Sequence, residues 1–151
     1  MKRFQEIDQF IAGTMQQWGI PAVRLSFAVI FIWFGLLKPM GLSAAAPLVL
    51  ATVDWMPLLS AETWLSVIGW WEVAIGICFL FQSTLRIAIA LLFLQMVGTF
   101  MPLVILSGVT FQEGLIPFGP TVEGQYIIKN LMIISAALVV GGSLSKRTQD
   151  G

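Results

Sequence analysis

The residue of this sequence with the clearest potential for chemistry is Glu72, a single carboxylate inside an apolar run. It lies eight positions after Trp64 and nine before Phe81, which places it near the midplane if the run crosses a membrane. A charged group at that depth costs about 2.5 kcal/mol or more, so it should face other helices and be paired or protonated. We therefore expect Glu72 to point into a helix bundle.

A partner for this carboxylate is needed on another helix, and two lysines qualify. Lys129 lies about five residues inside the outer end of the apolar run 125–142, and Lys38 closes the outer end of the run 21–37. Lys129 is the preferred candidate and Lys38 the second. Either pair would bury an ion pair between helices.

Other polar residues repeat at helical spacing in the neighbouring runs. Arg24, Gly35 and Lys38 share one face of the first run, and Gln95 shares a face with Gly98 in the third. Together with Asn130, these groups predict a small polar pocket. The candidate site residues are thus Glu72, Lys129, Lys38, Gln95, Asn130 and Arg24. Such a cluster either binds a ligand, quinone or proton, or only fixes the order and register of the helices.

Glycines flank the candidate site and predict close helix packing. Gly69 and Gly76 lie on the face of Glu72, and small residues on both sides let another helix approach. Gly35 and Gly98 occupy comparable positions in the first and third runs. The tryptophans Trp64, Trp70 and Trp71, in contrast, are interpreted as interface anchors and lipid-facing bulk.

The sequence lacks the motifs that mark catalytic, metal or cofactor sites in soluble enzymes. It has no histidine and one cysteine, Cys78, so it cannot form an internal disulfide or supply the usual ligands of zinc, haem or iron–sulfur centres. A phosphate-binding glycine loop, a dinucleotide fingerprint and a nucleophile elbow are missing too. We assign no catalytic residue, no metal ligand and no intrinsic cofactor. The zero net charge also argues against nucleic acid as a partner.

Composition predicts what positions these residues. Of 151 residues, 58% are hydrophobic and 11% charged, and the apolar residues cluster in long runs. A helix needs about 20 mostly apolar residues to cross a bilayer. We therefore predict an all-α, integral membrane four-helix bundle over residues 20–142. Its spans are expected at about 21–37, 64–81, 85–106 and 125–142.

The connecting segments are expected to lie at the two membrane surfaces. Residues 1–19 predict a cytoplasmic amphipathic helix, and residues 143–151 a cytoplasmic tail. The first outer loop, residues 39–63, predicts short interfacial helices at 48–53 and 55–59. Residues 107–124 form the second outer loop, and Pro102 should kink the end of the third span. A signal peptide cleaved near Ser43 is the weaker alternative, because Lys38 and Pro39 interrupt the approach.

Basic residues predict the orientation. With four alternating spans, six lie on one side and two on the other, and basic residues favour the cytoplasm. The first set is Lys2, Arg3, Arg24, Arg86, Lys146 and Arg147, and the second Lys38 and Lys129. Both termini are therefore expected in the cytoplasm.

Several short motifs resemble the DoxX-like family of small bacterial membrane proteins, and most closely its YkgB/RclC-type branch. They are Arg24 with Phe34-Gly35-Leu36-Leu37-Lys38, Trp71-Glu72 with Gly76, Gly98-Thr99-Phe100 with Pro102, and Glu123-Gly124-Gln125-Tyr126 with Lys129-Asn130. The likeness covers about residues 20–142.

This resemblance implies a multi-pass protein of the bacterial inner membrane. RclC-type members are associated with resistance to reactive chlorine species, and other DoxX-like proteins with quinone-coupled sulfur oxidation or with oxidoreductase complexes that handle thiol stress. The resemblance marks Gly35, Lys38, Glu72 and Lys129 as sites to test, without a catalytic role. With Cys78 alone, the chain has no cysteine pair for thiol chemistry of its own.

Three functions remain open from the sequence. The first is an accessory component in redox or oxidant stress handling that binds a quinone or a partner oxidoreductase. The second is a small proton-coupled transporter that uses Glu72 and works as a homo-oligomer. The third is a purely structural membrane subunit.

Overall fold

The computed structural model describes residues 2–147, and within them the regular structure is helical, as the composition predicts. The elements are α1 (Lys2–Leu37), α2 (Ala46–Val53), α3 (Ala61–Leu80), the 3-10 turn η1 (Gln82–Thr84), α4 (Leu85–Phe100), α5 (Pro102–Ile105), α6 (Ser107–Thr110), α7 (Val122–Ile128) and α8 (Asn130–Arg147). The described chain has no β-strand, only an isolated antiparallel bridge between Phe111 and Pro120.

Four helical segments among the described residues are long and apolar enough to cross a membrane. They are Arg3–Leu37, Ala61–Leu80, Gln82–Ile105 and Val122–Leu144. In the most apolar window of each, 33% of the residues or fewer are buried inside the protein. Apolar side chains therefore cover the outside of the bundle, as a lipid-facing surface requires.

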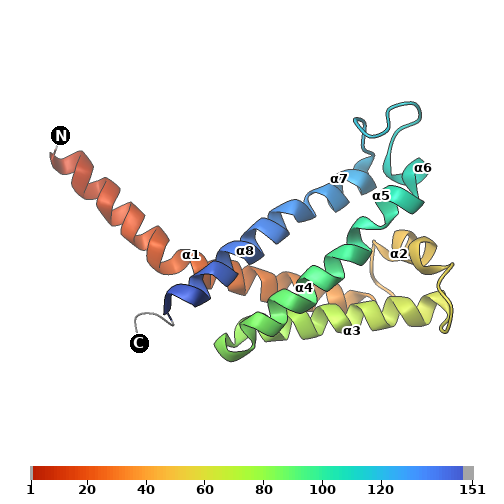
Figure 1. Ribbon diagram of the computed structural model, residues 1–151, viewed down its shortest axis with the longest axis horizontal. Coiled ribbons are helices and arrows are strands. Elements are labelled where there is room, and N and C mark those ends of the chain that lie inside the picture. The colour runs from red at the N-terminus through yellow and green to blue at the C-terminus, as the bar shows by residue number, and fades with distance from the viewer. Residues whose placement is uncertain (1, 148–151) are drawn as a thin grey trace.

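The sequence predicts an amphipathic helix over residues 1–19 and a separate first span from about residue 21, and helix α1 differs from this prediction. It is one continuous helix of 36 residues with Pro21 inside it, so residues 2–19 extend the first span without a break. This part of α1 projects past the other helices (Figure 1). Its apolar side chains are exposed, Phe4 and Phe10 each to 77%. Residue 1 and residues 148–151 of the expected tail lie outside the described residues.

The first outer loop contains one helix instead of two. Helix α2 covers the predicted segment 48–53, but residues 55–59 form turns and bends. Pro57 cannot donate a backbone hydrogen bond, and Leu58 has a φ of 85°, which is incompatible with a right-handed helix. Ser60 then caps α3 by accepting a hydrogen bond from the Thr63 amide at 3.3 Å, so this helix begins three residues before Trp64.

Two of the long segments are interrupted near the second outer loop. Pro102 lacks an amide hydrogen, and the helix breaks at Met101 between α4 and α5, where the sequence predicts a kink. The second break, at Lys129 between α7 and α8, was not expected. Helix α7 also begins at Val122, because the Thr121 side chain accepts a hydrogen bond from the Gly124 amide at 3.2 Å.

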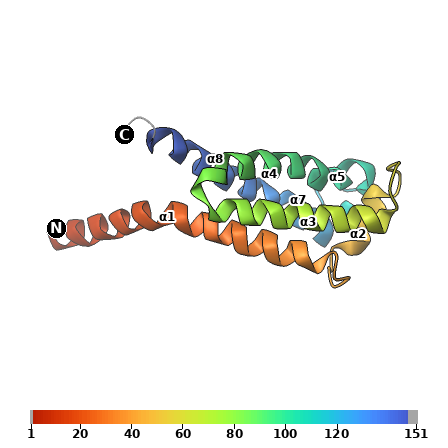
Figure 2. The same ribbon diagram turned by 90° about the horizontal axis from the view of Figure 1, so that it is seen from below.

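Helices α1 and α3 are the most closely packed pair in the bundle and run side by side (Figure 2). A Cβ atom added at Gly35 would lie 2.7 Å from the Gly69 carbonyl oxygen, and one added at Gly76 would lie 2.9 Å from the Ile32 amide nitrogen. Because these contacts are to backbone atoms, the helix axes can approach only if these positions lack side chains. We call this contact the α1–α3 seam.

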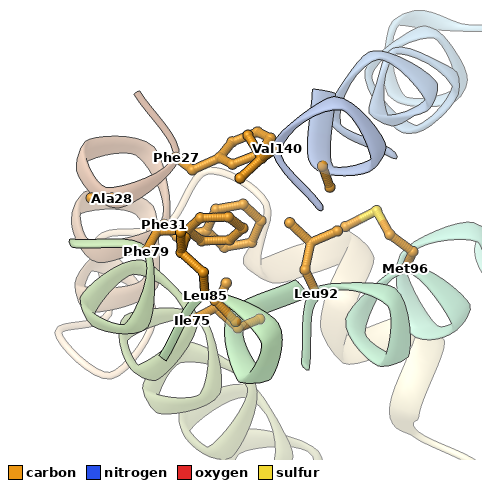
Figure 3. Close-up of a cluster of buried hydrophobic side chains, with 11 residues drawn as sticks. Phe27, Ala28, Phe31, Ile75, Phe79, Leu85, Leu92, Met96 and Val140 are labelled. Atoms are coloured by element: carbon orange, nitrogen blue, oxygen red, sulfur yellow. The ribbon is translucent and has the colours of Figure 1, made fainter. Parts of the chain in front are cut away.

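The hydrophobic core occupies the end of the bundle that carries η1, which we call the turn end. There Phe27 of α1 and Phe79 of α3 pack with ring centroids 4.7 Å apart, and Leu92 of α4 and Val140 of α8 close the cluster (Figure 3). The opposite end of the bundle carries α2. There, helices α3 and α7 diverge (Figure 1). The bundle is therefore packed at the turn end and more open at the α2 end.

Candidate functional site

A cavity of about 1000 Å³ occupies the α2 end of the bundle. Its lining comes from α1, α2, α3, α4, α5, α7, α8 and the segments next to α2, and most of it is apolar. Phe31 and Met96 belong to both the core and the cavity wall, so the core forms the floor of the cavity. Its lining includes Leu48, Val49, Thr52, Met56, Trp64, Ile68, Trp71, Leu94, Thr99, Tyr126, Ile127 and Ile133.

Glu72 lies in the wall of this cavity and is held by side chains from two other segments. Lys38 donates a hydrogen bond to Glu72 Oε2 and forms an ion pair with it, and Gln95 Nε2 donates to Glu72 Oε1 at 3.0 Å. The side chains of Lys38 and Glu72 are 7% and 13% exposed. Both carboxylate oxygens are therefore occupied, as expected for a charge in an apolar setting.

The α1–α3 seam explains why Lys38 reaches Glu72. Lys38 directly follows Leu37, the last residue of α1, and its Cβ would be 2.8 Å from a Cβ at Gly69. Because Gly69 has no side chain, the end of α1 lies against α3 less than one turn before Glu72. The helix C-terminus also favours a positive charge at this position.

The preferred partner in the sequence, Lys129, was the wrong choice. Its side chain is exposed, and its Nζ lies 5.1 Å from the centroid of the Tyr126 ring. The prediction needs the fourth span beside Glu72, but α8 packs against α1 and α4, whereas the end of α1 lies against α3. Lys38, the second candidate, forms the pair.

The side chains of Asn130 and Arg24 donate hydrogen bonds to backbone carbonyls. Asn130 lines the cavity, but its Nδ2 donates to the carbonyls of Tyr126 and Ile127, both at 3.0 Å, next to the break between α7 and α8. Arg24 lies at the turn end, where Nε donates to the Phe79 carbonyl at 3.2 Å. Its Nη2 donates to the Leu80 carbonyl at 2.9 Å. Arg24 thus satisfies the last carbonyls of α3 and does not join the Glu72 cluster.

Gly98 also departs from its predicted role. It is exposed, lines the cavity and has no atom within 4 Å of the position that a Cβ would take, so it does not serve helix packing within the chain. Gly35, Gly69 and Gly76 all lie in the α1–α3 seam.

Two cavity residues that the sequence interpretation missed are tryptophans of α3. Trp64 and Trp71 line the cavity, whereas Trp70 is 57% exposed on the outside, as a lipid-facing residue would be. The helical spacing of Trp64, Ile68 and Trp71 is the signal that could have placed them beside Glu72. The contribution of α2 to the cavity was missed as well, because an eight-residue segment does not by itself indicate which side packs on the bundle.

The lining of the cavity is mostly apolar and includes a few polar groups. Its apolar wall with a few polar groups is typical of small-molecule sites. Within residues 2–147, no group of three or more His, Cys, Asp or Glu side chains is placed to hold a metal ion. Cys78 packs against the core cluster and is half-buried, away from the cavity lining.

Comparisons with protein-family models, curated proteins and solved structures give no match to this chain.

Proposed function

We propose that this chain is a multi-pass protein of the bacterial inner membrane and an accessory component in redox or oxidant stress handling, including reactive chlorine stress. Its cavity would bind a lipid-soluble redox molecule such as a quinone, and a partner oxidoreductase would carry out the chemistry. The observation that carries the proposal is the apolar cavity of about 1000 Å³ with the Lys38–Glu72–Gln95 cluster in its wall.

The size and polarity of the cavity support a lipid-soluble ligand. Small-molecule sites typically measure about 300–1000 Å³ and combine apolar walls with a few fixed polar groups. A quinone ring is apolar on its faces and carries two carbonyl oxygens, which match this kind of lining. Because the sequence contains one cysteine and no histidine, electrons would be carried by the bound molecule or by the partner.

The proposed orientation puts both termini and the turn end in the cytoplasm. It rests on the basic residues, of which Arg24 and Arg86 belong to the turn end and Lys38 to the α2 end. The cavity would then open in the outer half of the membrane, where a lipid-soluble molecule can enter from the side.

A deletion strain tests this function. We expect lower survival under hypochlorite and under a thiol oxidant, and recovery with the wild-type gene. A Glu72→Gln copy should fail to restore survival, because it loses the charge that holds Lys38. Glu62→Gln is the matched control, since Glu62 is an exposed acid on the same helix.

The amounts of each variant in the membrane must be measured in the same strains. Equal survival of the deletion and wild-type strains under both oxidants would refute the stress function. If Glu72→Gln lowers survival only in proportion to its own abundance in the membrane, the Glu72 cluster has a structural role. The third hypothesis, a structural subunit, is then favoured.

A proton-coupled transporter is less consistent with the geometry. Both oxygens of Glu72 already accept hydrogen bonds, and the aromatic side chains of Phe27, Phe31 and Phe79 fill the bundle at the turn end. A transported ion would have to pass this packed region.

A further inference from the structure

Trp64, in the cavity wall, has an unpaired indole N–H group. Trp64 Nε1 is buried, yet it has no hydrogen-bond partner among the described residues. Trp71 on the same helix, by comparison, donates from its Nε1 to the Leu91 carbonyl at 3.4 Å. Buried indole N–H groups usually have an acceptor, and leaving one unpaired is unfavourable because the group has lost its hydrogen bonds to water.

The position of Trp64 relates this unpaired donor to the rest of the cavity. Trp64 lies in the first turns of α3, eight residues before Glu72, which corresponds to about 12 Å along the helix axis. Ile68 and Trp71 line the wall between them. The wall thus contains a buried, unpaired N–H in its outer part, an apolar middle and a polar cluster deeper in.

We propose that the cavity takes an uncharged, lipid-soluble molecule whose oxygen accepts a hydrogen bond from Trp64 Nε1, with its apolar part lying along Ile68 and Trp71. This ligand class refines the proposed function, on which it rests. The indole nitrogen is a donor only, so the ligand group that faces it must be an acceptor, such as a ketone, quinone or ester carbonyl.

The charge of the site favours an uncharged ligand. Lys38 and Glu72 neutralise each other, and Gln95 occupies the second carboxylate oxygen. A charged ligand beside this pair would lose its hydration without gaining a free counter-charge, because the one other charged residue of the lining, Glu123, is exposed and lies outside the pair. A neutral carbonyl compound avoids this cost.

Binding of defined probes to the purified full-length protein in nanodiscs tests the proposal. The probes are decylubiquinone, 2-tridecanone, which has one carbonyl, and tridecane, which has none. Retention above that of empty nanodiscs gives the affinity. The variant Trp64→Phe keeps an aromatic ring and removes the N–H, and Trp70→Phe on the outer face is the matched control.

We expect Trp64→Phe to weaken binding of the carbonyl probes by roughly 3- to 10-fold, because one hydrogen bond of about 0.5–1.5 kcal/mol is lost. Binding of tridecane, and all binding by Trp70→Phe, should stay within about 2-fold of the wild type. Equal affinity of Trp64→Phe and the wild type for both carbonyl probes would overturn the inference, and so would binding of neither carbonyl probe.

The outcomes separate this inference from the proposed function. Binding of decylubiquinone that is insensitive to Trp64→Phe refutes the inference and keeps the quinone proposal. Binding of 2-tridecanone that depends on Trp64, without binding of decylubiquinone, supports the acceptor site and refutes the quinone proposal.

Discussion

The Glu72 carboxylate has its two oxygens held by different segments of the chain. Lys38 follows α1 and Gln95 belongs to α4, so the cluster links three of the four long segments at one point. In an apolar environment such a pair is costly to assemble and more costly to break, because the remaining charge is left without a partner. The cluster should therefore matter for stability whatever ligand the cavity binds.

Removing one member of the pair tests this at the residue scale. We expect Lys38→Met to lower the free energy of unfolding by about 3 kcal/mol or more, since it leaves the Glu72 carboxylate unpaired. The double variant Lys38→Met/Glu72→Leu should recover at least half of that loss. Unfolding in mixed micelles, followed by circular dichroism, measures both.

Lys129→Met is the control for this experiment. Lys129 is exposed and contacts the Tyr126 ring, so its removal should cost no more than about 1 kcal/mol. Equal losses for Lys38→Met and Lys129→Met, or strictly additive losses in the double variant, would contradict the role assigned to the pair.

At the scale of the elements, the α1–α3 seam positions the cluster. Three glycines, Gly35, Gly69 and Gly76, bring the two helices into backbone contact, and this contact carries Lys38 to Glu72. The turn end of the seam is closed by Arg24, which donates to the last carbonyls of α3. Helix α3 is therefore held near its middle and at its last turn by residues that belong to or follow α1.

A methyl group placed in the seam should separate the two helices. In Gly35→Ala the new Cβ would lie 2.7 Å from the Gly69 carbonyl oxygen and 2.9 Å from the Val73 amide nitrogen, and backbone atoms cannot move aside easily. We expect a loss of about 1–3 kcal/mol in the free energy of unfolding.

Gly98→Ala provides the matched helical control. The added methyl group meets no atom within 4 Å, so we expect stability to be unchanged or higher by up to about 1 kcal/mol, from the better helix propensity of alanine. Thermal unfolding of both variants in the same detergent gives the comparison. A Gly35→Ala protein as stable as Gly98→Ala would show that the seam tolerates separation.

For the whole molecule, the uneven packing along the bundle is the main feature. The core fills the turn end, while α2 and α7 belong to the wall of the cavity at the other end. Between α6 and α7, the Thr121 amide donates to the Thr110 carbonyl at 2.9 Å and joins the two ends of the second outer loop. Which end faces the cytoplasm determines from which side a partner protein can reach the cavity.

Cysteine labelling of intact cells tests the proposed orientation. In a Cys78→Ala background, Glu113→Cys in the loop between α6 and α7 should react with a membrane-impermeant maleimide, and Ser83→Cys in η1 should react only after permeabilisation. Both native side chains are exposed, so access to the reagent depends on the side of the membrane. The opposite labelling pattern would reverse the proposed topology.

The sequence by itself determined the all-α architecture, the four apolar segments and the burial of Glu72. These follow from local composition and periodicity, because a long apolar run must form a helix when no water can hydrogen-bond its backbone. The Pro102 break could be predicted for the same local reason, the missing amide hydrogen.

Only the tertiary structure decided which residues meet. It selected Lys38 over Lys129, moved Arg24 from the cluster to the end of α3, and brought Trp64 and α2 to the cavity. The pattern of residues indicates the face of each helix but not the order of helices around the bundle, which places the end of α1 against α3 and α8 against α1 and α4. Which residue pairs with Glu72 depends on how the helices are arranged in space. That Glu72 needs a partner depends only on its burial.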